Sequence, residues 1–286
     1  MAYTWSDPDV SKRPVAVIGG GVLGRRLCMM WACTGYEVRL FERSDEVAKA
    51  ALAYINENID AQVKAINGKR GVVTASSTLE EAVGNAWMVI EAIPERLELK
   101  IPLFEELDNI TKPDCILASN SSSYKSSEMI VKVKNTYRVC NGHYYMPPVQ
   151  NCVEFMTCGH TDPGVIALLM KEAKSVGFVP IQARVECTGF IFNRIWAAMK
   201  REVLLVLQEG VATPEDIDTV FVTTFGANTG LCQLMDKVGL DTVYNIEKHY
   251  VEERHISSTA MDWLKANYVD KGKLGNKSGG GLLTRK

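Results

Sequence analysis

The sequence lacks the features that would direct a protein to a membrane or to nucleic acid. None of its apolar runs reaches the roughly 20 residues that span a bilayer. Its 32 lysines and arginines are balanced by 34 aspartates and glutamates, and no extended basic run offers a footprint for nucleic acid or an anionic surface. We therefore expect neither a nucleic-acid partner nor a membrane partner.

Paired cysteine motifs are missing as well. The eight cysteines are scattered, which predicts buried reduced thiols rather than a disulfide framework or a zinc site. Residues 1–14 contain Asp7 and Asp9 and no apolar core, unlike a secretory signal or an acid-poor transit peptide, and the final LLTRK differs from a peroxisomal address. We therefore expect a cytoplasmic protein without a metal.

The most informative segment that is present runs from residue 15 to residue 42. The apolar run 15–18 predicts a buried parallel strand, and a glycine-rich turn, a helical pattern and a second strand ending at Glu42 follow it. The turn satisfies G-x-G-x-x-G with Gly19, Gly21, Val22, Leu23 and Gly24. In this order the elements predict a dinucleotide-binding unit, and a glycine turn in another α/β domain is the alternative.

Each glycine of this motif has a physical role in that interpretation. Gly19 permits the tight turn, Gly21 lets the backbone approach a pyrophosphate, and Gly24 lets the helix pack close to the strand. We expect Glu42 to accept hydrogen bonds from the adenosine ribose and to repel a 2′-phosphate, so NAD is favoured over NADP. Arg43 keeps NADP open, since it could bind that phosphate if Glu42 swung away.

Short apolar segments alternate with helical patterns up to about residue 184, which predicts a Rossmann-type doubly wound parallel sheet. After Glu42 the predicted strands are Val72–Thr74, Trp87–Ile90, Cys115–Ala118, Arg138–Asn141, Cys152–Met156 and Val179–Ala183. From residue 185 onward the pattern is helical, and Thr213 before Pro214 is a good helix start. We therefore predict an NAD-binding domain over 1–184 and an all-α C-terminal domain over 185–286.

Polar side chains follow successive strands of this predicted sheet, where ligands bind in open parallel sheets. Ser122 lies in a serine run after the strand 115–118, and His143 comes just after the strand 138–141. Histidine suits proton transfer near neutral pH, and a nearby carboxylate would fix its tautomer. A solvated serine loop and a structural histidine remain the alternatives at these two positions.

Several motifs of the chain resemble those of the L-3-hydroxyacyl-CoA dehydrogenase family over nearly its whole length. The matching segments are Ser119-Asn120-Ser121-Ser122, His143-Tyr144-Tyr145-Met146-Pro147, Val153-Glu154, Thr188-Gly189-Phe190-Ile191-Phe192-Asn193-Arg194, Glu209-Gly210, Glu215-Asp216-Ile217-Asp218 and Val238-Gly239-Leu240-Asp241. Glu154 matches the glutamate of the family that orients the histidine if one residue is deleted between the two.

This resemblance implies an NAD-dependent dehydrogenase that interconverts a 3-hydroxy and a 3-oxo compound, or a related alcohol and ketone, by hydride transfer. It implies that His143 takes the hydroxyl proton, that Glu154 holds the imidazole, and that Ser122 and Asn193 donate hydrogen bonds to the substrate oxygen. We also place Glu95, Lys100 and Asn120 in the cofactor site and Tyr145 and Met146 in the substrate pocket.

Two departures from the family concern the substrate. Met146 replaces an asparagine of the family, which makes the pocket less polar. The segment between Glu42 and the strand near Val72 is shorter than usual, and in the acyl-CoA enzymes it forms a helical hairpin that touches the CoA nucleotide. We therefore expect a substrate without CoA. A genuine L-3-hydroxyacyl-CoA dehydrogenase is one alternative, and a catalytically weakened NAD(H)-binding sensor or structural protein is another.

The C-terminal domain carries more large apolar side chains than one face of a small domain readily buries. They include Phe190, Ile191, Ile195, Trp196, Met199, Leu204 and Leu205. We therefore expect a homodimer formed through this substrate and dimerisation domain.

Overall fold

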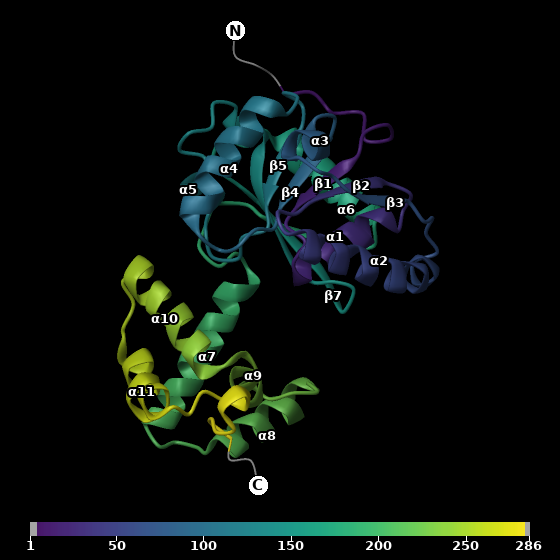
Figure 1. Ribbon diagram of the computed structural model, residues 1–286. Helices are drawn as coiled ribbons and strands as arrows, with labels where there is room; N and C mark the ends of the chain where they lie inside the picture. Colours follow the sequence, from purple (N-terminus) through teal and green to yellow (C-terminus); the bar gives the residue numbers. More distant parts are fainter. Residues whose placement is uncertain (1–4, 284–286) are drawn as a thin grey trace. The chain divides into compact units, whose positions relative to one another are not determined.

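The computed structural model describes residues 5–283 and divides into two compact units, Met1–Ile191 and Phe192–Lys286 (Figure 1). Residues 1–4 and 284–286 lie outside the described part. They belong to the two terminal segments from which we predict a cytoplasmic location. The division falls after Ile191 rather than at residue 184 because the turn after the last strand still packs on the sheet. Phe190 in that turn clusters with Met156 and Ala183 and is 2% exposed.

The first unit contains one eight-stranded sheet in the order β3-β2-β1-β4-β5-β6-β7-β8. Its strands are β1 (Val15–Ile18), β2 (Glu37–Phe41), β3 (Val72–Ala75), β4 (Met88–Glu91), β5 (Ile116–Ser119), β6 (Val139–Met146), β7 (Gln150–Thr157) and β8 (Val179–Ala183). All neighbours pair in parallel except β6 and β7, which are antiparallel. The Rossmann-type fold is confirmed, with one antiparallel pair added to the predicted parallel sheet.

Helices cover both faces of this sheet because its central strands bury side chains on both sides. In β1, Val15 and Val17 pack in the same cluster as Trp31, whereas Ala16 packs with Phe104 in the cluster on the other face. The helices of this unit are α1 (Val22–Ala32), α2 (Asp45–Ala65), α3 (Leu79–Val83), α4 (Leu97–Ile110), α5 (Ser126–Met129) and α6 (Pro163–Ser175), with a short 3₁₀ turn at Thr136–Arg138.

The strand β6 is longer than the sequence predicts. The predicted strand ends at Asn141 and leaves His143 in a loop, but β6 continues to Met146 and pairs with β7. The predicted strand is too short because Gly142, the first residue after it, is typical of loops. Here the antiparallel partner supplies the backbone hydrogen bonds that hold this glycine in a strand. His143 therefore lies on a sheet rather than on a loop.

The described part of the second unit is helical, as predicted. Its helices are α7 (Phe192–Gln208), α8 (Pro214–Phe225), α9 (Leu231–Val238), α10 (Leu240–Arg254) and α11 (Thr259–Asn267), followed by 3₁₀ turns at Val269–Lys271 and Asn276–Ser278. The predicted cap of α8 is confirmed, since the Thr213 hydroxyl accepts a hydrogen bond from the N–H of Asp216. Sequence reasoning missed α9, which is short and lies between Gly230 and Gly239.

The eight cysteines are free thiols, and all except Cys152 and Cys187 are buried. Between residues 5 and 283, no helix combines the length and apolarity that a membrane span requires. The same residues contain no group of three or more histidine, cysteine, aspartate or glutamate side chains suited to a metal ion.

Candidate active site

The glycine-rich turn lies after β1, where the strand order reverses between β1 and β4 and where ligands bind in such sheets. Gly19 has a φ of +106°, and a Cβ there would lie 2.6 Å from the carbonyl oxygen of Ala92. A Cβ on Gly24 would lie 1.8 Å from the carbonyl oxygen of Gly19. A Cβ on Gly21 would meet no atom of the described residues within 4 Å. Protein packing therefore requires two of these glycines, and the third borders open space that a ligand can use.

Glu42 closes the other side of this turn. Its carboxylate accepts hydrogen bonds from the N–H of Gly20 at 2.8 Å and from the N–H of Ser44 at 3.0 Å, which fixes it beyond the end of β2. Gly21 is the N-cap of α1 and has no side chain to cap the helix, so an anion can take that place. Arg43 is exposed. A dinucleotide with its phosphates at Gly21 and its ribose at Glu42 fits these residues.

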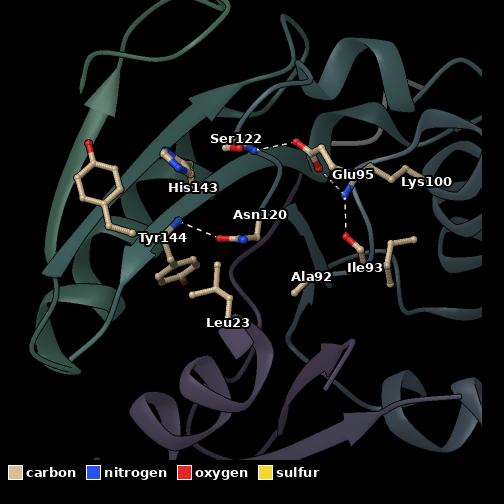
Figure 2. Close-up of a pocket in the computed structure, with 10 residues that line it drawn as sticks. Leu23, Ala92, Ile93, Glu95, Lys100, Asn120, Ser122, His143 and Tyr144 are labelled. Carbon is tan, nitrogen blue, oxygen red and sulfur yellow. Dashed lines mark hydrogen bonds and ion pairs between the residues drawn. The ribbon is translucent and has the colours of Figure 1, made fainter. Parts of the chain in front are cut away.

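A cavity of about 310 Å³ adjoins the ends of β4 and β5 and the middle of β6 (Figure 2). Its lining consists of Leu23, Ala92, Ile93, Glu95, Lys100, Asn120, Ser122, His143, Tyr144 and Tyr145. Seven of these positions are site residues that the sequence predicts, and they come from segments far apart along the chain. The fold thus brings the serine motif, the histidine motif and the glycine-rich turn to one cavity.

A buried ion pair lies beside this cavity. Lys100 is 1% exposed, and its Nζ lies 2.6 Å from Oε1 of Glu91, whose other oxygen accepts a hydrogen bond from the Ser119 hydroxyl at 2.6 Å. Sequence reasoning placed Lys100 in the cofactor site but missed Glu91 as its partner. The available signal was a carboxylate that ends an otherwise apolar strand, because a buried charge needs an opposite one.

Glu95 organises the serine run that follows β5. Its Oε1 accepts hydrogen bonds from the Ser121 hydroxyl at 2.5 Å and from the N–H groups of Ser122 and Ser123 at 3.1 and 3.0 Å. Burial opposes ionisation, but the bond from Ser121 and the charge of Lys100 outweigh it and hold the pKa of Glu95 below its ordinary value. The serine run is therefore a turn held by a carboxylate, with Ser121 buried and Ser122 and Ser123 exposed.

Asn120 joins this turn to the neighbouring strand. Its Oδ1 accepts a hydrogen bond from the backbone N–H of Tyr144 at 2.9 Å (Figure 2). Because Tyr144 follows His143 directly in β6, this bond fixes the position of the serine motif relative to the histidine.

His143 and Glu154 form a pair across the antiparallel strands β6 and β7. They stand opposite each other in the register, and Nδ1 of His143 lies 3.3 Å from Oε2 of Glu154. The two residues are 7% and 2% exposed. A carboxylate at Nδ1 favours the tautomer that carries its proton there, so Nε2 is the nitrogen that can accept a proton. This arrangement suits general acid–base chemistry.

Two aromatic rings flank this histidine. The centroid of Phe190 lies 4.9 Å from that of the imidazole with the planes tilted by 30°, and Tyr145 lies edge-on at 5.1 Å. Burial, together with the negative charge of Glu154, raises the pKa of Tyr145. Sequence reasoning named Tyr145 but gave Phe190 no role at the site. Its place in the motif after Gly189 was the only available signal.

The remaining predicted residues lie at different places. Met146 ends β6, is 39% exposed and is absent from the cavity lining, although Tyr145 belongs to it. The pairing of β6 with β7 shifts register between Tyr144 and Met146, so Met146 lies in an irregular end of the strand. Val22 begins α1 and is 57% exposed. Asn193 lies in the first turn of α7, within the second unit.

Comparison with known families gives two matches that together cover nearly the whole chain. Residues 14–187 match the family described as 3-hydroxyacyl-CoA dehydrogenase, NAD binding domain, and residues 189–285 match 3-hydroxyacyl-CoA dehydrogenase, C-terminal domain. These matches coincide with the Rossmann-type and helical parts of the structure.

Individual relatives agree with these families. The probable 3-hydroxybutyryl-CoA dehydrogenase of Bacillus subtilis is 31% identical over 281 residues, covering 94% of this chain and 96% of that protein. The 3-hydroxyacyl-CoA dehydrogenase-like protein LAM1 of Cochliobolus heterostrophus is 47% identical over 146 residues, which are 50% of this chain but only 31% of that protein.

Solved structures show the same architecture. A diketoreductase that acts on dicarbonyl compounds superposes with a TM-score of 0.79 at 30% identity, covering 96% of this chain and 99% of that one. The (S)-3-hydroxybutyryl-CoA dehydrogenase of Ralstonia eutropha superposes with a TM-score of 0.86 at 26% identity and the same two coverages.

Proposed function

The chain belongs to the 3-hydroxyacyl-CoA dehydrogenase family and is an NAD-dependent oxidoreductase that interconverts 3-hydroxy and 3-oxo small molecules, and from this premise we propose that its own substrate carries no coenzyme A. The observation that carries the proposed chemistry is the buried pair of His143 and Glu154 beside the cavity.

The cofactor would be held mainly by the glycine-rich turn. The open side of Gly21 would receive the pyrophosphate, Glu42 the adenosine ribose, and Leu23 and Asn120 the part that reaches the cavity. Bound there, NAD supplies the hydride acceptor for oxidation and NADH the hydride donor for reduction. Nζ of Lys100 lies 3.2 Å from Oε2 of Glu95 in the lining of the same cavity.

The side chains of the cavity would handle the proton and the substrate oxygen. Nε2 of His143 would accept the hydroxyl proton during oxidation and return it during reduction, while Glu154 keeps the imidazole in the required tautomer. Ser122 would donate a hydrogen bond to the substrate oxygen, and we propose Asn193 as a second donor. All four residues are retained, which argues against the alternative of a catalytically weakened NAD(H)-binding sensor.

The segment between β2 and β3 supports a substrate without CoA. Its only described helix is α2, and residues 66–71 lead directly into β3. The cations near its end are exposed, and Nη1 of Arg70 pairs with Asp60 at 2.6 Å. CoA phosphates need fixed cationic partners, and a paired surface arginine is a poor one. The structural similarity to a diketoreductase favours a small carbonyl compound as well.

NADH consumption with a panel of 3-oxo acids, CoA thioesters and cyclic ketones tests this proposal. We expect the best small or cyclic carbonyl compound to exceed acetoacetyl-CoA in kcat/KM, and free CoA not to compete with it. If acetoacetyl-CoA were the best substrate, with a low-micromolar KM, the chain would instead be a genuine L-3-hydroxyacyl-CoA dehydrogenase.

We further propose that the chain forms a homodimer through its second unit. No residue of α8 is buried, and Val220 and Phe225 are 65% and 73% exposed. These side chains line a groove of about 320 Å³ together with Phe221 and Leu231. A contiguous apolar surface of this kind is typical of an interface.

Sedimentation at micromolar concentration tests the dimer. We expect a dimeric mass for the parent protein and a shift toward monomer in Phe225→Asp. The matched control is Val149→Asp, at a valine of the first unit that is 82% exposed, and this variant should sediment like the parent. A monomeric parent protein would refute the proposal.

We also propose a cytoplasmic location, which is supported by the eight free thiols because a reducing compartment preserves them. Fractionation of cells that express a tagged chain tests it, and recovery in an organelle would contradict it.

A further inference from the structure

A single turn of the chain contacts both members of the His143–Glu154 pair. The ring of Phe190 packs against the imidazole, with centroids 4.9 Å apart and planes tilted by 30°. The backbone N–H of the next residue, Ile191, donates a hydrogen bond to Oε1 of Glu154 at 3.0 Å. Because Oε2 of the same carboxylate faces Nδ1 of His143, the two oxygens of Glu154 have different partners.

The backbone of this turn is unusual. Phe190 has a φ of +54°, in the left-handed region that bulky side chains rarely adopt, and it follows Gly189 at +78°. Such a conformation persists only where the surroundings enforce it, and it is concentrated at functional sites. Here Phe190 is 2% exposed and packs on Met156 and Ala183 of the sheet.

The left-handed conformation has a local consequence for the pair. It occurs at Phe190 itself, directly before the residue that makes the backbone contact, so the same turn presents the side chain of Phe190 to His143 and the N–H of Ile191 to Glu154. On another side the imidazole meets the ring of Tyr145, whose plane is inclined by 66°. The imidazole is therefore confined by two aromatic rings and one carboxylate.

We infer that Phe190 is a positioning residue for the reaction: its ring fixes the plane of the His143 imidazole, while the N–H of Ile191 fixes the carboxylate of Glu154. This inference rests on the proposed role of His143 as the proton acceptor. A looser imidazole would present Nε2 to the substrate oxygen less often, so the proton-transfer step would slow while cofactor binding remained unchanged.

The test replaces Phe190 with asparagine, which tolerates the left-handed conformation and so keeps the turn while removing the ring. We expect kcat to fall roughly 10- to 100-fold, as misplacement of a catalytic group produces, with the Kd for NADH unchanged. If the hydroxyl proton leaves in the same step as the hydride, the deuterium isotope effect on kcat of a substrate labelled at the hydride-donating carbon should rise, because that step becomes more limiting. Phe190→Tyr keeps a ring and should restore most of kcat.

Two further variants keep the test decisive. Phe190→Leu retains apolar volume without a ring, so it should show the same loss of kcat if Phe190→Asn does not fold. Phe104→Leu changes a fully buried phenylalanine of α4 that packs in a different cluster from Phe190, and it should leave kcat and the isotope effect at parent values.

The outcomes separate this inference from the proposed function. If His143→Ala is inactive but Phe190→Asn and Phe190→Leu have parental kcat and isotope effects, the positioning role is wrong and the proposed base stands. An equal loss in Phe190→Tyr would also overturn the positioning role. If His143→Ala keeps parental turnover, the proposed function fails first.

Discussion

Both units pair an arginine with a buried carboxylate, as Arg138 and Asp108 or Arg201 and Glu247 show, but they differ in how they treat a buried lysine. In the first unit, Arg138 is fully buried and its Nη2 lies 2.8 Å from Oδ1 of Asp108, and Lys100 and His143 have carboxylate partners too. In the second unit, Lys200 is 2% exposed and its ammonium lies 5.4 Å from the ring centroid of Trp196. A buried amine without a close carboxylate costs stability, whereas a paired one largely offsets its desolvation.

They also differ in how much apolar surface they cover. The helix α8 of the second unit buries none of its residues, while the strands β1, β4 and β5 of the first unit are buried throughout. The first unit thus contains the glycine-rich turn and the proposed base. The second unit leaves the apolar side chains of α8 exposed and the buried ammonium of Lys200 without a close carboxylate among the described residues. We therefore expect cofactor binding and proton transfer to depend on single side chains of the first unit, and assembly to depend on the second.

The largest effect should come from the proposed base. We expect His143→Ala to lower turnover by about 10²–10⁴-fold, the usual contribution of general acid–base catalysis, without weakening NADH binding. Steady-state kinetics with the best ketone of the panel measures it. His160→Ala, at an exposed histidine of the same unit, is the matched control and should behave like the parent. Undiminished activity in His143→Ala would place the chemistry elsewhere.

A smaller loss should follow from Glu154→Gln. The amide keeps the shape of the side chain but removes the charge that orients the imidazole, and hydrogen bonds to charged groups contribute about 1.5–3 kcal/mol, or roughly 10- to 100-fold. We expect kcat to fall within that range and to remain above that of His143→Ala. A loss larger than that of His143→Ala would show that Glu154 does more than hold its partner.

Cofactor choice should change with Glu42. In Glu42→Ala we expect the preference for NADH over NADPH to narrow by roughly tenfold, the lower end for a hydrogen bond to a charged group at a partly exposed site. Fluorescence titration of both cofactors measures it, with Glu46→Ala in the exposed first turn of α2 as control. If the parent protein preferred NADPH, the assignment of NAD as cofactor would be wrong, and Arg43 would be the expected partner of the 2′-phosphate.

The second unit should become more stable when its buried amine is removed. Burial lowers the pKa of Lys200 from 10.5 to about 8, with Glu247 opposing the shift. Between these two values the unfolded chain holds more protons, so stability should rise with pH, and below pH 8 the full cost of the buried charge is present. We expect Lys200→Met to raise the free energy of unfolding by about 3 kcal/mol at pH 7.

Urea denaturation of Lys200→Met and the parent at pH 7 and above pH 10 measures this effect. The gain should shrink at the higher pH, where the lysine is neutral in the folded state and increasingly neutral in the unfolded one. The control Lys248→Met, at a side chain that is 53% exposed, should shift little at either pH. A destabilised Lys200→Met at pH 7 would mean that the ammonium contributes favourably where it lies.

Much of the first unit could be predicted because its signals are local. The strand 15–18, the glycines after it and the strand that ends near Glu42 all follow from apolar runs and turn chemistry within a few residues. The strand through His143 could not be found in this way. Its residues become a strand through antiparallel pairing with β7 across a short turn, a hairpin that the sequence reasoning did not recognise.

Some residues of the candidate site could likewise be predicted from motifs, and others could not. The motifs place Ser122, His143 and Glu154 by resemblance, and the fold brings Ser122 and His143 to one cavity. The packing of Phe190 on the imidazole depends on a left-handed residue, which a single sequence does not reveal outside glycine. Met146 was placed in the pocket from its neighbours in the motif, but it is absent from the cavity lining and follows a register shift in β6 that the sequence pattern does not reveal.

Measuring NADH binding and turnover side by side in His143→Ala and Glu42→Ala tests most directly whether base and cofactor turn act separately. We expect opposite patterns. His143→Ala should bind NADH like the parent and turn over about 10²–10⁴-fold more slowly, whereas Glu42→Ala should bind NADH more weakly and retain turnover at saturating cofactor. If His143→Ala lost NADH binding together with turnover, or kept full turnover, the separation of base and cofactor turn within the first unit would be contradicted.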